Sequence, residues 1–158
     1  MTKVQANTQG PPQPAAPGPA LKHLDVLVGT WEMTGHTLDS EQENITGWNA
    51  CEWLPGGFFL KSFGEINFNG VMVQSLEIIG YDPASKTFPS SVYSNLGGDV
   101  LTYSWDVQGS TVTHADESSK YTGTLSADGK TLSGGWRPKK GAKEIAENAY
   151  DAVMSRVK

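Results

Sequence analysis

Short segments in which hydrophobic and polar residues alternate follow one another along most of the chain, and turn-forming residues separate them. The alternation is clearest in the segment 99–107, where one face would carry Leu101, Tyr103, Trp105 and Val107. A period of two places successive side chains on opposite faces, so each such segment is predicted to be a β-strand with one buried face. Asn69-Gly70 gives the strongest hairpin signal in the chain, because both residues tolerate positive φ.

The pattern predicts nine strands in the body of the chain, joined mostly by short loops. They are Thr30–Leu38, Asn44–Leu54, Phe58–Phe68, Val71–Tyr81, Thr87–Ser94, Asp99–Val107, Ser110–Glu117, Lys120–Ser126 and Thr131–Arg137. Strands joined by short hairpin loops form an antiparallel meander, and a long meander avoids exposed edges by closing on itself. We therefore expect an all-β fold, a closed antiparallel up-and-down β-barrel of about ten strands.

A short N-terminal helix is expected to plug one end of this barrel. It is indicated by the hydrophobic residues Leu21, Leu24, Val26, Leu27 and Val28. Gly29 and Thr30 would end this helix, and Trp31 would open the first strand and point inward as a floor for the barrel.

The two ends of the chain are less regular. Residues 1–20 are rich in proline and have almost nothing to bury, so we expect a disordered tail before a barrel domain over residues 21–158. A docking peptide is the alternative for this tail. Residues 141–158 fit both helical spacing and alternation. We expect a helical turn over Ala142–Asn148 and a tenth strand over Tyr150–Val157 that pairs with the first.

Composition and charge narrow the classes of function. The formal net charge of −5 at pH 7 would repel phosphate backbones, so nucleic-acid binding is not expected. Cys51 is the single cysteine and fits a core position, and three scattered histidines do not suggest a metal site. No signal peptide or membrane-spanning run of about 18 apolar residues is visible. We expect a cytoplasmic protein that does not bind membranes, with a homodimer left open.

Several short motifs resemble those of a bacterial domain family of unknown function, of the DUF1579 type, within the calycin-like group. They are Leu24-Asp25-x-Leu27-Val28-Gly29-Thr30-Trp31, Leu54-Pro55-Gly56-Gly57-Phe58-Phe59-Leu60, Glu77-Ile78-Ile79-Gly80-Tyr81-Asp82, Asp128-Gly129-Lys130-Thr131-Leu132 and Ser155-Arg156-Val157. That group contains lipocalins, fatty-acid-binding proteins and nitrobindins. The resemblance implies a closed barrel of about ten strands, but fold analogy does not settle an activity.

Strand alternation suggests which residues line an interior pocket. In lipocalin-like barrels the first-strand Trp points inward, which would place Trp31 and Met33 on the inner face. The candidate ligand-binding residues are Trp31, Met33, Phe63, Tyr103, Trp105, His114, Tyr150 and Arg156. Tyr150 and Arg156 would form an anion clamp, like the arginine that fatty-acid-binding barrels use for a carboxylate. The alternative is an Arg156 that seals the barrel over Trp31.

His114 is the most informative single residue, because an inward histidine can act as a base, hold a ligand or bind a haem iron. Polar neighbours in the sequence leave open the alternative of a surface histidine. Candidate catalytic residues are His114, Glu65 and Tyr103. Glu52 and Glu77 are further carboxylates that desolvation could turn into proton shuttles if they face inward.

Three functions remain open at the level of the sequence. The first is a small-molecule-binding barrel, a carrier or sensor for an apolar or aromatic ligand. The second is a cofactor-independent enzyme, an isomerase, cyclase or lyase that uses pocket acid–base groups. The third is nitrobindin-like haem binding through His114; otherwise no cofactor is expected.

Overall fold

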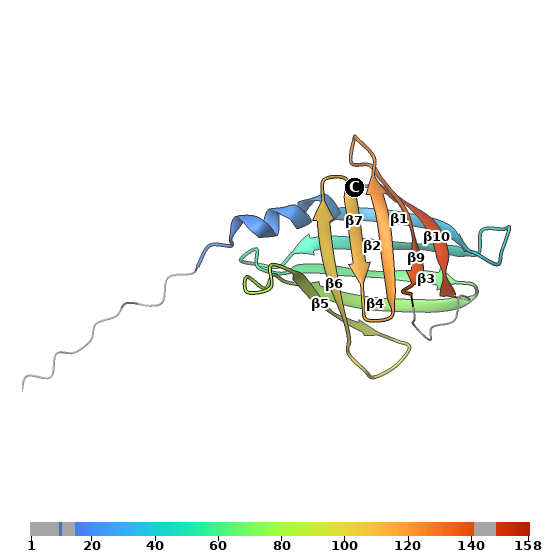
Figure 1. Cartoon of the computed structure of the whole chain (residues 1–158), viewed down its shortest axis with the longest axis horizontal. Helices are drawn as coiled ribbons and strands as arrows, with labels where there is room; N and C mark the ends of the chain where they lie inside the picture. Colours follow the sequence, from blue (N-terminus) through green and yellow to red (C-terminus); the bar gives the residue numbers. More distant parts are fainter. Residues whose placement is uncertain (1–9, 11–14, 141–147) are drawn as a thin grey trace, which may run out of the picture.

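The protein is a closed antiparallel barrel with one short helix at an end, as predicted (Figure 1). The computed structural model describes residues 10, 15–140 and 148–158. Its elements are η1 (Pro19–Leu27), β1 (Gly29–Thr37), β2 (Ile45–Trp53), β3 (Leu60–Phe68), β4 (Val71–Ile79), β5 (Phe88–Ser94), β6 (Leu101–Gln108), β7 (Thr111–Ala115), β8 (Ser119–Leu125), β9 (Thr131–Pro138) and β10 (Tyr150–Arg156). Among these residues, no helix is long and apolar enough to cross a membrane.

Each strand pairs with the strands that precede and follow it in the sequence, and β10 closes the barrel by pairing with β1. In this closing pair, Trp31 lies opposite Arg156 and Thr37 lies opposite Tyr150. The predicted hairpin at Asn69-Gly70 is present, and both residues have positive φ, 50° and 91°. Pairing around the whole circumference leaves no open sheet edge, which is the physical reason for the closure.

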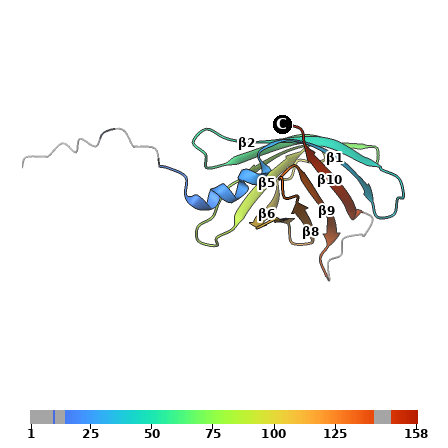
Figure 2. The same ribbon diagram turned by 90° about the horizontal axis from the view of Figure 1, so that it is seen from above.

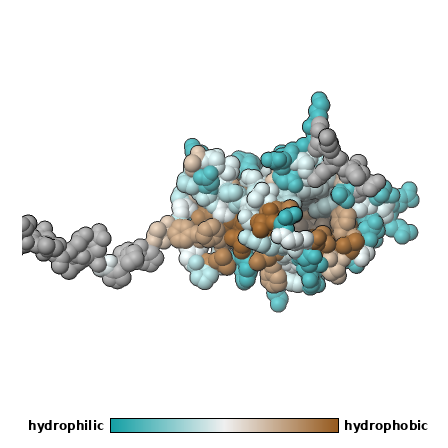
Figure 3. Space-filling model, turned by 90° about the horizontal axis from the view of Figure 1, so that it is seen from below, coloured by the Kyte–Doolittle hydropathy of each residue, from teal (hydrophilic) through white to brown (hydrophobic). Residues whose placement is uncertain are grey.

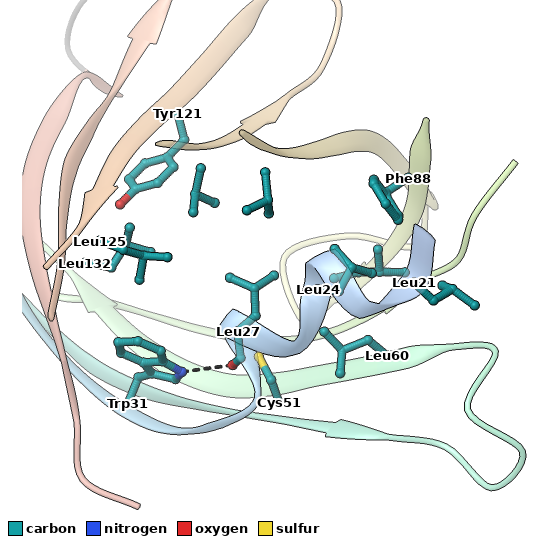
Figure 4. Packing of buried hydrophobic residues seen from close by; sticks show 13 residues of the cluster. Leu21, Leu24, Leu27, Trp31, Cys51, Leu60, Phe88, Tyr121, Leu125 and Leu132 are labelled. Carbon is teal, nitrogen blue, oxygen red and sulfur yellow. Dashed lines mark hydrogen bonds between the residues drawn. The ribbon is translucent and has the colours of Figure 1, made fainter. Parts of the chain in front are cut away.

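The helix η1 lies at one end of the barrel and begins two residues earlier than the sequence pattern predicted (Figures 1 and 2). Its buried residues Leu21, Leu24 and Leu27 pack against hydrophobic residues from the strands, among them Leu60 and Phe88 (Figure 4). Proline at the start of a helix needs no intrahelical partner for its nitrogen, which suits Pro19 to this place. The helix therefore acts as the predicted plug.

The predicted tenth strand is confirmed as β10. The helical turn predicted over Ala142–Asn148 falls almost entirely on residues 141–147, which lie outside the described residues. The same applies to most of the predicted disordered tail, because residues 1–9 and 11–14 also lie outside them.

Candidate functional site

The barrel contains a cavity of about 310 Å³ that is partly open to solvent and is lined by strand residues, with none from η1. Its lining is mostly apolar and unusually rich in aromatic side chains. The aromatic members are Trp48, Tyr103, Trp105, Tyr121, Trp136 and Tyr150. A volume of this size lies at the small end of the range of about 300–1,000 Å³ that is typical of small-molecule sites.

Much of this aromatic lining comes from one row of residues that runs across five neighbouring strands. In the strand register, Tyr150 lies opposite Trp136, Trp136 opposite Tyr121, Tyr121 opposite His114, and His114 opposite Trp105. Directly opposed residues share one face of a sheet and have their Cβ atoms about 5 Å apart. The row therefore forms a continuous ring-bearing wall from β10 to β6.

A buried carboxylate stands beside this wall and gathers three hydrogen bonds. The Oε1 atom of Glu77 lies 2.6 Å from Ser90 Oγ, 2.7 Å from Trp105 Nε1 and 3.0 Å from His114 Nε2. An indole N–H can only donate, so this oxygen accepts. Four consecutive strands, β4 to β7, each contribute one of these residues.

The charge state of Glu77 follows from a balance of opposing effects. Burial by itself raises the pKa of Glu77, because it disfavours the charged form. The hydrogen bond and positive charge of His114, with the hydrogen bonds from Ser90 and Trp105, outweigh this and lower the pKa below its ordinary value of 4.5. The carboxylate is therefore ionised at neutral pH. Glu77 thus faces inward, but the raised pKa that desolvation alone would give is wrong for this residue.

The imidazole of His114 is held by ring contacts as well as by Glu77. Its centroid lies 4.1 Å from that of Trp105, with the planes 20° apart, and 4.6 Å from that of Tyr103. The ring of Trp136 lies edge-on to the imidazole, with the two ring centroids 5.7 Å apart. His114 thus faces the interior, and the alternative of a surface histidine is wrong. Because Glu77 is ionised, Nε2 carries the hydrogen of this bond, and Nδ1 of a neutral ring is an acceptor.

The tyrosines of the wall stay protonated over the physiological range. Burial raises the pKa of Tyr150 to about 12, with a further contribution from the nearby Tyr103. Burial also raises the pKa of Tyr121 strongly, with Tyr150 adding to the effect. Neutral phenols can both donate and accept hydrogen bonds, so these side chains give the cavity polar points without a charge.

The structure brings five of the sequence-predicted site residues together around the cavity. They are Met33, Tyr103, Trp105, His114 and Tyr150. Two others lie on the outside of β3. Phe63 is 42% exposed, and Glu65 accepts a hydrogen bond from Gln74 at the surface. The expectation that Phe63 and Glu65 face the pocket is therefore wrong.

Phe63 belongs to a set of apolar residues on the outer face of the barrel. It lies opposite Leu76 on β4, which lies opposite Tyr93 on β5, and all three are exposed. Figure 3 shows that hydrophobic residues form patches among hydrophilic ones on the face drawn there. Exposed apolar side chains on this sheet explain why hydrophobicity alone does not identify its inner face.

Trp31 and Arg156 belong to the plugged end and do not line the cavity. Trp31 is 2% exposed and donates a hydrogen bond to the carbonyl of Leu27 at 2.9 Å. The guanidinium of Arg156 donates to the carbonyls of Val26, at 2.7 Å, and of Val28. This is the barrel-sealing arrangement, and it leaves Arg156 outside the anion clamp that was expected with Tyr150.

Several cavity residues had no place among the candidates. They are Trp48, Asn49, Ser75, Tyr121, Leu132, Trp136 and Met154. For Tyr121 a signal existed, because Tyr121, Gly123 and Leu125 alternate with lysine and threonine along β8. Glu77 could be named only as a carboxylate that would act if it faced inward, because hydrophobic residues stand on both faces of β4 and leave its orientation open. Within the described part of the chain, no three His, Cys, Asp or Glu side chains are placed to hold a metal ion.

Comparison with known proteins places the chain in a family. A search of curated proteins finds no match for the sequence. The family described as "Protein of unknown function (DUF1579)" matches residues 16–155, which covers η1 and all but the last residue of the barrel strands. The chain therefore belongs to the DUF1579 family.

Proposed function

We propose that this protein binds a small apolar or aromatic molecule inside its barrel, as a carrier or sensor of the calycin-like kind. The observation that carries the proposal is the row of aromatic residues from Tyr150 to Trp105 that faces a cavity of about 310 Å³. Aromatic walls offer a flat apolar surface for stacking, and the phenols and indoles add polar points that orient a ligand.

The two ends of the barrel suggest a route of access. At one end, η1 and the Arg156–Trp31 contact fill the interior with side chains. Toward the other end, inner-face positions of the strands carry apolar residues that are exposed, namely Leu101 at 47% and Val71 at 53%. An apolar mouth of this kind lowers the cost of passage for an apolar ligand.

Tryptophan fluorescence provides the test, since Trp48, Trp105 and Trp136 all line the cavity. The protein is titrated with a panel of fatty acids, flavonoids and small aromatic metabolites. We expect saturable quenching by some aromatic members, weakened by Trp136→Ala, and unchanged by Leu76→Ala on the outer face. The absence of a saturable response across the whole panel would contradict a binding cavity.

A second function is favoured by one specific contact, the 3.0 Å pair of His114 Nε2 and Glu77 Oε1. A carboxylate that holds one nitrogen of an imidazole sets its tautomer and makes the other nitrogen a general base. The alternative function is therefore proton abstraction by a cofactor-independent isomerase, cyclase or lyase. Deuterium exchange into small carbonyl compounds in D₂O, followed by NMR, tests it. Exchange must be lost in His114→Asn; no exchange by the unaltered protein counts against catalysis.

Haem binding is the least favoured function. Coordination of iron by Nε2 of His114 would break its bond with Glu77, and Trp105 and Tyr103 already lie against the imidazole ring. The residues around His114 therefore do not fit a haem whose iron is bound by Nε2. A Soret band after incubation with haem, removed by His114→Ala, would reverse this judgement.

A further inference from the structure

We infer that the cavity selects aromatic ligands that bear a hydrogen-bond donor and no negative charge, and that Glu77 excludes carboxylates. The inference rests on the proposed binding function and adds the chemical class of the ligand. It is the opposite of the expectation that an arginine in the pocket would hold a ligand carboxylate.

The first support is the charge inventory of the cavity. Glu77 lines it as an ionised carboxylate, and no lysine or arginine among the described residues lines it. Three cations of the described strands, Arg156, Lys61 and Arg137, are engaged elsewhere. Arg156 donates to backbone carbonyls at the plugged end, and Lys61 pairs with Glu52 at 2.5 Å on the outer face. Arg137 pairs with Asp151 at 2.6 Å, also on the outside.

The second support is the direction of the hydrogen bonds around Glu77. Three donors already converge on its Oε1, and each of them is thereby used. What Glu77 offers to a ligand is acceptor capacity. The neighbouring phenols of Tyr121 and Tyr150 donate and accept equally well, so they do not discriminate between ligands.

Electrostatics then decides which ligands are accepted. A ligand carboxylate would lose its hydration in the cavity, meet no lysine or arginine there, and stand beside the carboxylate of Glu77. Coulomb repulsion is strong in such a site because the local dielectric constant is low. A phenol, an alcohol or an ammonium group on the same ring would instead donate to Glu77 and replace the lost water. The cavity thus favours neutral and cationic aromatic donors.

The experiment compares three ligands that share one naphthalene ring: 2-naphthalenemethanol, 2-naphthylmethylamine and 2-naphthoate. Their dissociation constants are measured by tryptophan quenching and by calorimetry near neutral pH. We expect the alcohol and the amine to bind at least about tenfold more tightly than the carboxylate. In Glu77→Gln, naphthoate should gain affinity and the amine should lose it. Glu32→Gln is the matched control, since it removes an exposed carboxylate from the outer face of β1 and should change none of the three values.

Each outcome has a separate meaning. If naphthoate binds the unaltered protein as tightly as the alcohol, charge selection is overturned while the binding function stands. If a gap exists but Glu77→Gln leaves it unchanged, the assignment to Glu77 is overturned. If none of the three ligands binds, nor any member of the broader panel, the proposed binding function itself fails. The comparison on the unaltered protein remains decisive even where Glu77→Gln does not fold.

Discussion

The guanidinium of Arg156 lies 4.2 Å from the centre of the Trp31 indole ring, and the two residues are direct neighbours in the pairing of β10 with β1. Trp31 also donates to the carbonyl of Leu27 in η1, and Arg156 donates to the carbonyl of Val26 in the same helix. A cation over an indole ring within about 6 Å is an attractive contact. One residue pair therefore joins the first strand, the last strand and the plug.

Replacement of Arg156 by lysine is expected to destabilise the fold by about 2 kcal/mol. Lysine keeps the charge, but its single ammonium cannot reproduce the planar stack on Trp31 or donate at once to the carbonyls of Val26 and Gly129. The free energy of unfolding in urea measures the effect. Arg137→Lys serves as the control, because Arg137 is half-exposed and its pair with Asp151 lies at the surface. A loss no greater than in this control would contradict the sealing role.

The plug offers a second prediction. Leu24 is fully buried in the main hydrophobic cluster, so Leu24→Ala should destabilise the protein by roughly 2–5 kcal/mol through lost burial and a new void. Lys22 lies on the exposed side of η1, next to the buried Leu21. Lys22→Ala should therefore change the stability little. Thermal unfolding followed by circular dichroism compares the two variants. Equal midpoints would mean that η1 is not part of the cooperative core.

The barrel was predictable because its signals are local. Asn69-Gly70 specifies a tight hairpin through the backbone freedom of two adjacent residues, and both adopt positive φ. In β6, polar residues occupy every second position, so Tyr103 and Trp105 could be assigned to the interior without knowledge of any partner strand. Short loops between such strands leave little choice of topology.

The site was harder to predict, because small or polar residues face inward on part of the cavity wall and large apolar residues face outward there. On β3 the cavity is lined by Ser62 and Gly64, while the bulky Phe63 points outward. Small inner residues leave the space that the aromatic wall faces, so a rule that turns large apolar residues inward fails here. The contact of Glu77 with His114 was also out of reach, since it joins strands that are three apart in the sheet and depends on the curvature of the barrel.

The lowered pKa of Glu77 makes a prediction for acid stability. The folded state keeps the carboxylate ionised at pH values below its ordinary pKa of 4.5. The contribution of Glu77 to the stability of the fold is therefore fully present above pH 4.5. It is lost as the pH falls through the lower pKa of the folded protein. The stability of the unaltered protein should therefore decline more steeply than that of Glu77→Gln as the pH falls below 4.5.

Other carboxylates titrate in the same range, notably Asp82, Asp116 and Asp128, whose pKa values are also lowered by hydrogen bonds. The difference between the two proteins isolates Glu77, because these aspartates are common to both. Urea unfolding at a series of pH values gives this difference. Parallel profiles would show that the carboxylate is no better stabilised in the folded state than in the unfolded chain.

Tyr150 makes the opposite prediction at alkaline pH. Its pKa rises from an ordinary value of 10 to about 12, because ionisation would place a negative charge in the buried wall beside Tyr103. The fold therefore favours the neutral phenol, and this contribution is present below pH 10 and lost as the pH rises toward 12. Absorbance of tyrosinate near 295 nm should show a late-titrating group that is missing in Tyr150→Phe. Tyr93→Phe is the control, because it removes a tyrosine that is 48% exposed on the outer face and should leave the late-titrating absorbance unchanged. No loss of late-titrating absorbance in Tyr150→Phe would mean that Tyr150 meets solvent, and the aromatic wall would then be open to water at β10.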